Sequence, residues 1–135
     1  MKIAWIEDDA PVIESLIYPL EKEGFAVQKF ASVTEAKRAV DAILQSDLIL
    51  LDIILPPGPD AEALSTYPGR DLLREWRSSY RELPPVLVLT AVRNRDVLDE
   101  VRKMGVADVI TKPTLPSILQ KRVHELLDVR DSGSP

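Results

Sequence analysis

Short apolar segments alternate along the chain with segments whose apolar residues recur at helical spacing. The first pattern is typical of strands buried in a parallel sheet, and the second is typical of helices packed on such a sheet. Together they predict strands over residues 2–6, 25–30, 47–52, 86–89 and 107–111, and helices over residues 11–23, 32–44, 69–79, 95–104 and 115–129. This order predicts an α/β domain with a parallel sheet covered by helices on both faces.

Capping signals support the helix boundaries independently of the apolar pattern. Asp9 precedes the first predicted helix, Pro11 lies in its first turn, and Gly24 stands at its end. Ser32 and Glu35 have the spacing of a capping box, which opens the second predicted helix.

Residues 53–68 interrupt the alternation. The segment contains Gly58 and four prolines, Pro56, Pro57, Pro59 and Pro68, and it predicts an extended loop after the third strand. Long connections in compact domains are usually functional or mobile. A lid, a surface for partner docking and tolerated extra length all remain open. We expect one domain over residues 1–128 and a tail, or the start of a linker, over residues 129–135.

Charge and cysteine content narrow the choice of function. The net charge of -5 and the lack of a long basic stretch argue against direct nucleic-acid binding by this chain. The sequence contains no cysteine, which excludes thiol chemistry and fits a cytoplasmic protein. The apolar start is too short for a secretory signal, and no segment reaches the roughly 18 apolar residues of a transmembrane helix. We therefore expect a cytoplasmic protein with no membrane partner.

Four of the predicted strands lead directly into side chains that carry chemistry. These residues are Glu7, Asp8, Asp52, Thr90 and Lys112. Ligands of parallel sheets bind beyond the carboxyl ends of the strands, so one shared site is expected there. With strand order 2-1-3-4-5 the second strand is an edge, and its lack of a polar end fits this expectation. The only histidine, His124, is expected to be a solvated side chain.

The acidic residues predict a magnesium site. Two carboxylates about 4 Å apart repel by about 4 kcal/mol at an effective dielectric near 20, so a cluster of three requires a cation or a raised pKa. Oxygen ligands favour Mg²⁺. We expect the ligands to be Glu7, acting through a water, with Asp8, Asp52 and the backbone carbonyl of Ile54.

Asp52 is the best candidate nucleophile of the predicted site. A carboxylate can attack phosphorus and form an acyl phosphate. The ammonium of Lys112 and the hydroxyl of Thr90 are suited to binding phosphoryl oxygens. The residues therefore predict phosphoryl transfer that depends on positioning and electrostatics.

The motifs Glu7-Asp8, Asp52-Ile53-Ile54-Leu55-Pro56, Thr90-Ala91 and Lys112-Pro113 resemble those of CheY-like receiver domains of two-component response regulators. The resemblance covers residues 2 to about 128. It implies a flavodoxin-like, doubly wound, five-stranded sheet of order 2-1-3-4-5 and a cis Lys112–Pro113 peptide. It also implies magnesium and phosphoryl transfer to Asp52 from a sensor histidine kinase or phosphotransfer protein. The domain would be regulatory, acting only on its own phosphorylation and dephosphorylation. A candidate homodimer surface comprises residues 95–104, 107–111 and 115–129.

Two features depart from the family pattern. Val109 stands where the family usually has Tyr or Phe, and the loop over residues 53–68 is longer than usual. A degenerate receiver that binds a partner independently of phosphorylation therefore stays open as an alternative. A haloacid-dehalogenase-type phosphatase is disfavoured, because the second acid it needs two residues after the nucleophile is here Ile54.

Overall fold

The computed structural model describes residues 1–56, 58 and 66–132, with side chains described as far as residue 128. In this part of the chain five parallel strands form one sheet in the order β2-β1-β3-β4-β5. The strands are β1 (Lys2–Ile6), β2 (Ala26–Phe30), β3 (Leu48–Leu51), β4 (Val86–Thr90) and β5 (Asp108–Thr111). The predicted fold class and strand order are confirmed.

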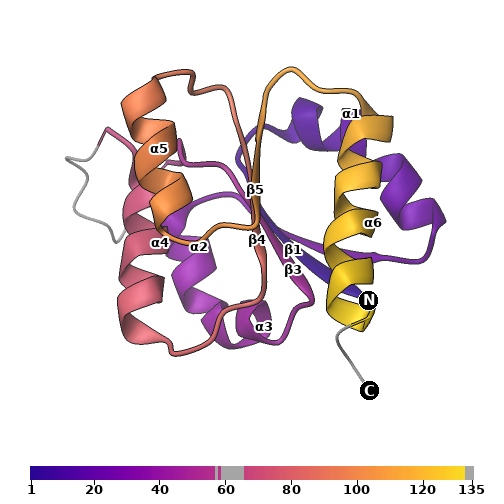
Figure 1. Cartoon of the computed structure of the whole chain (residues 1–135), viewed down its shortest axis with the longest axis horizontal. Coiled ribbons are helices and arrows are strands. Elements are labelled where there is room, and N and C mark those ends of the chain that lie inside the picture. Colours follow the sequence, from indigo (N-terminus) through magenta and orange to yellow (C-terminus); the bar gives the residue numbers. More distant parts are fainter. Residues whose placement is uncertain (57, 59–65, 133–135) are drawn as a thin grey trace.

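Six helices of the described segments flank the sheet. They are α1 (Ala10–Lys22), α2 (Val33–Arg38), α3 (Val40–Leu44), α4 (Pro68–Ser79), α5 (Arg95–Lys103) and α6 (Pro116–Ser132). Helices α1 and α6 cover one face, and α2 to α5 cover the other (Figure 1). Within the described parts of the chain, none of the helices combines the length and apolar character needed to span a membrane.

Two apolar layers, one on each side of the sheet, make up the core. Because successive strand residues point to opposite faces, β1 contributes to both layers: Trp5 packs with α1 and α6, and Ile6 packs with α2 to α5. Trp76 of α4 belongs to the second of these layers. The residues of β3 and β4 are all buried, as their continuous apolar sequences predict.

The capping predictions are confirmed. The Asp9 side chain accepts a hydrogen bond from the backbone N–H of Val12 at 3.2 Å. Ser32 Oγ accepts from the backbone N–H of Glu35 at 3.1 Å, and the Glu35 carboxylate in turn accepts from the N–H of Ala31 at 2.6 Å. These contacts satisfy backbone donors that a helix start leaves free.

All five predicted helices differ from the observed ones by at least one residue at a boundary, and three of the differences are informative. The predicted helix over residues 32–44 is divided into α2 and α3 at Ala39, and nothing in the sequence there explains the break. Helix α4 begins at Pro68, a residue type suited to the first helical position. Helix α6 continues to Ser132 instead of ending at Val129, because the first helix-breaking residue after Val129 is Gly133.

The first residues of the long connection between β3 and α4 are held against α2. The Val33 N–H donates to the carbonyl oxygen of Pro56 at 3.0 Å. Gly58, at φ +92°, lies so close to α2 that a Cβ would stand 2.4 Å from Thr34 Oγ1. Residues 57 and 59–65 of the predicted loop lie outside the described residues, as do residues 133–135 of the predicted tail.

Helix α6 meets the end of α1 on the face of the sheet that the two helices cover. His124 Nε2 lies 2.5 Å from a carboxylate oxygen of Glu23, and its ring contacts the ring of Phe25 edge-on. The Gln120 amide also donates to Glu23. His124 is exposed, as predicted, and it is also paired with Glu23.

Candidate functional site

Strand register brings the first two acidic positions together. Ile6 of β1 pairs with Leu51 of β3, so the residues that follow them, Glu7 and Asp52, stand side by side. The backbone N–H of Asp52 donates to the Ile6 carbonyl at 3.0 Å, which holds Asp52 against β1. Their neighbourhood therefore follows from the pairing of two apolar strands.

The same logic places the hydroxyl and the ammonium. Thr90 of β4 pairs with Thr111 of β5, and Lys112 follows directly. The backbone N–H of Lys112 donates to the Thr90 carbonyl at 2.8 Å. The Lys112–Pro113 peptide is cis, which confirms the prediction made from the family resemblance.

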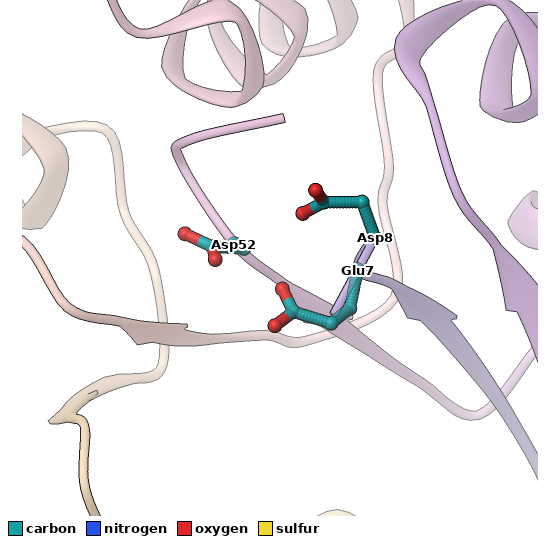
Figure 2. A group of neighbouring side chains, drawn as sticks. All are labelled: Glu7, Asp8 and Asp52. Carbon is teal, nitrogen blue, oxygen red and sulfur yellow. The ribbon is translucent and has the colours of Figure 1, made fainter. Parts of the chain in front are cut away.

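Three carboxyl groups gather at the ends of β1 and β3 (Figure 2). Glu7, Asp8 and Asp52 each offer an oxygen within 4.8 Å of the others. Glu7 and Asp52 are buried, with 2% and 6% of their surface exposed, whereas Asp8 is exposed. Two acids in this cluster are thus withdrawn from the solvent that would otherwise stabilise their charge.

Lys112 is the cation of the site. Its ammonium donates to Glu7 Oε1 and, at 2.9 Å, to Asp52 Oδ2. Burial alone lowers the pKa of Lys112, but the hydrogen bonds and negative charges of Glu7 and Asp52 outweigh it and raise the pKa above its usual value. Lys112 therefore stays protonated and faces both carboxylates.

Glu7 is incompletely satisfied. Burial, with the Asp52 carboxylate beside it, raises the pKa of Glu7 from 4.5 to about 8, against the opposing effect of Lys112. Among the described residues, Glu7 Oε2 has no hydrogen-bond partner. A buried carboxylate oxygen without a partner is costly. Because carboxylate oxygens are the ligands that Mg²⁺ takes, the cluster fits a divalent cation.

Asp52 lies at the centre of the hydrogen bonds. Its Oδ1 accepts from the hydroxyl of Thr90 at 2.8 Å and from the backbone N–H of Ile54 at 3.0 Å. Its Oδ2 accepts from Lys112. The structure thus brings together Asp52 and its predicted neighbours Thr90, Lys112 and Glu7. A ligand role for the carbonyl of Ile54 stays a prediction, since the recorded contact is made by its N–H.

Two contacts of the site were not foreseen from sequence. Arg93 donates through Nη2 to the carbonyl oxygen of Lys112 at 2.9 Å, linking the connections that follow β4 and β5. Gly69, in the first turn of α4, lies against the backbone carbonyl of Asp52. A glycine just inside a predicted helix was the available signal for the second contact, and no signal marked the first.

Val109 belongs to the apolar packing behind the site. It pairs with Val88 in the sheet and is half-buried against the layer covered by α2 to α5.

A cavity of about 260 Å³ opens beside Lys112, between α1 and the connection from β5 to α6. Its apolar lining includes Val12, Leu16 and Pro113.

Comparison with known proteins gives one consistent family. The family described as "Response regulator receiver domain" matches residues 3–124. The transcriptional regulatory protein QseB of Escherichia coli O157:H7 is 37% identical over 116 residues, which cover 84% of this chain and 47% of QseB. QseB of Haemophilus influenzae is 34% identical over 132 residues, which cover 94% of this chain and 52% of that protein. The chain therefore spans about half the length of these curated relatives.

Solved structures give the same result for the fold. The BeF3-activated N-terminal receiver domain of Klebsiella pneumoniae RstA superposes with a TM-score of 0.74 at 31% identity, covering 94% of this chain and 98% of that one. A CheY-like receiver domain protein from Methanospirillum hungatei JF-1 superposes with a TM-score of 0.77 at 24% identity, with 98% of each chain covered.

Proposed function

The chain belongs to the response regulator receiver domain family, and from that premise we propose that it is a phosphorylation-controlled signalling switch whose phosphoacceptor is Asp52. The observation that carries the proposal is the convergence of Thr90 and Lys112 on the two oxygens of the buried Asp52 carboxylate. A nucleophile with a hydroxyl and an ammonium at hand has what phosphoryl transfer requires.

The two oxygens of Asp52 differ in their contacts. Oδ1 accepts from the Thr90 hydroxyl and the rigid backbone N–H of Ile54, whereas Oδ2 accepts from the flexible Lys112 ammonium. Lys112 can move its hydrogen bonds to an incoming phosphoryl oxygen more easily than a backbone amide can. We therefore assign the attack on phosphorus to Oδ2; the new O–P bond forms as the bond between phosphorus and the donor's imidazole nitrogen breaks.

Magnesium fits the same site. Glu7, Asp8 and Asp52 would hold the ion, with the backbone carbonyl of Ile54 as a further ligand. When bound, it supplies positive charge that offsets the carboxylates and the phosphoryl oxygens. The unpartnered Glu7 Oε2 is the feature of the chain that supports this part of the proposal.

The partner would be a sensor histidine kinase or a phosphotransfer protein, with a homodimer forming through the face of α5, β5 and α6. We place the receiver domain at residues 1–128. The names of the QseB relatives suggest that its output is transcriptional regulation, carried out by another part of a longer protein. We do not expect this chain to bind nucleic acid directly, because its net charge is -5. A cytoplasmic location, which the lack of cysteine fits, belongs to the same proposal.

A phosphorylation-independent adaptor is less favoured. Such a protein has no need for buried acids whose charges are only partly neutralised. The structure nevertheless holds the buried acids in contact with a hydroxyl and an ammonium, through Glu7, Asp52, Thr90 and Lys112. Val109 bears on how the switch changes its output surface rather than on phosphorylation, because a valine cannot rotate between two positions as an aromatic ring would.

The decisive test is the mass of the intact protein after incubation with acetyl phosphate and Mg²⁺. We expect one phosphoryl adduct on the wild type and none on Asp52→Asn. Asp9→Asn is the matched control, because Asn keeps the helix cap and residue 9 lies beside the site without belonging to it. An adduct that persists in Asp52→Asn, or a wild type that stays unmodified, would overturn the proposal.

A further inference from the structure

The first turn of α4 lies directly on the peptide that carries the phosphoacceptor. The backbone N–H of Gly69 donates to the Ile53 carbonyl at 3.0 Å. A Cβ built on Gly69 would stand 2.1 Å from the Asp52 carbonyl oxygen and 2.7 Å from the Ile53 Cα. Both separations are shorter than the 3.0 Å below which real Cβ atoms are essentially never found. The helix can therefore approach β3 this closely only where residue 69 has no side chain.

Backbone conformation does not explain this glycine. Gly69 is helical, and the described glycines with positive φ are Gly24, Gly58 and Gly105. Glycine in a helix is less favourable than alanine. That cost is offset here by the close approach of two backbones, since the neighbouring atoms belong to the main chain and cannot rotate away.

We propose that Gly69 is a positioning residue for Asp52. By letting α4 rest on the Asp52 peptide, it fixes the carboxylate against Thr90, whose hydroxyl lies 2.8 Å away. A Cβ at residue 69 would lie 2.1 Å from the Asp52 carbonyl oxygen, whereas ordinary contact begins at 3.4 Å, so the two backbones would have to separate by more than 1 Å. Hydrogen bonds weaken over such a distance. The inference rests on the proposed role of Asp52 and adds the element that holds that residue in place.

The test compares Gly69→Ala with Gly24→Ala. Gly24 is a matched control because it is also a glycine whose replacement strains the fold, through its φ of +97°, but it has open space around it and lies away from the site. Two quantities are measured on folded protein: the phosphorylation rate at saturating acetyl phosphate, and the Mg²⁺ affinity by calorimetry without a phosphoryl donor.

We expect Gly69→Ala to phosphorylate about 10- to 100-fold more slowly at saturating donor, the size of effect that a 1 Å misplacement produces. Mg²⁺ binding should weaken in parallel, because Asp52 is also a proposed ligand. Gly24→Ala should match the wild type in both. A rate for Gly69→Ala within twofold of the wild type, or an equal loss in both variants, would overturn the inference.

Folding failure is separable from mispositioning. If Gly69→Ala does not fold alone, it is refolded in trimethylamine N-oxide, which favours the compact state, and compared with wild type in the same solution. A normal rate and normal Mg²⁺ affinity there would show that the residue serves folding only. If the wild type itself takes up no phosphoryl group, the proposed function fails, whereas the Mg²⁺ affinities of the two glycine variants still test the positioning role.

Discussion

The two ends of the sheet carry pairs of ionisable groups in different environments. At the carboxyl end, Lys112 faces Glu7 and Asp52, and the three side chains are 13%, 1% and 8% exposed. At the other end, His124 faces Glu23, and these side chains are 45% and 30% exposed. Burying charge costs free energy that an ion pair seldom recovers, whereas a surface pair costs and contributes little. The buried cluster of Lys112, Glu7 and Asp52 is thus better explained by a role in the chemistry of the site than by a contribution to the stability of the fold.

The largest effect on stability is expected from removing the buried cation. Lys112→Met leaves Glu7 and Asp52 without their shared ammonium, and breaking a buried pair costs about 3–5 kcal/mol. We expect a loss of this order in the free energy of unfolding, measured by urea titration at pH 8 in a chelator. Lys103→Met, on the exposed surface of α5, is the control and should change it by less than about 0.5 kcal/mol. If the two variants lost the same free energy of unfolding, the burial of Lys112 would have no special effect on stability.

The pH dependence of stability should come next. The pKa of Glu7 rises from 4.5 to about 8 in the fold, so the folded protein binds this proton more tightly than the unfolded chain does. The stabilising contribution is complete below pH 4.5 and is lost as the pH rises through about 8, with a slope of at most about 1.4 kcal/mol per pH unit. The contribution of Glu7 is isolated by measuring the free energy of unfolding by urea, in a chelator, for wild type and for Glu7→Gln across this pH range. A difference between the two proteins that does not change with pH would contradict the expectation.

A smaller and opposite effect is expected from the exposed acid of the cluster. Asp8→Asn removes a negative charge that lies beside Glu7 and Asp52, and it should raise the metal-free stability by about 1 kcal/mol. The same change should weaken Mg²⁺ binding by more than the roughly 10-fold that loss of an outer-shell partner costs. Calorimetric titration and urea unfolding measure the two quantities on one variant. A loss of stability with unchanged Mg²⁺ affinity would exclude Asp8 from the metal site.

The smallest effect is expected at the other end of the sheet. Glu23→Gln removes the charge that faces His124 and should change the free energy of unfolding by less than about 1 kcal/mol, since both groups are partly exposed. The rate of phosphorylation by acetyl phosphate should equal that of the wild type. A large change in that rate would mean that the two ends of the sheet are coupled.

The fold and most of the site follow from features that are local in sequence. The apolar strands fix the sheet, and residues that directly follow a strand are placed by it, which is why Glu7, Asp52 and Lys112 could be assigned in advance. The contact between Gly69 and Asp52 could not, because it depends on how closely α4 settles after a long connection. The contact of Arg93 depends on one conformer of a long, flexible side chain.

The placement of the two tryptophans, Trp5 with α1 and α6 and Trp76 with α2 to α5, has an experimental consequence. Replacing either one by phenylalanine leaves a single indole that reports on one side of the molecule alone. Stopped-flow refolding of the two single-tryptophan proteins can therefore time the assembly of each half separately. Coinciding traces would indicate that both halves form together, and diverging traces would show which half forms first.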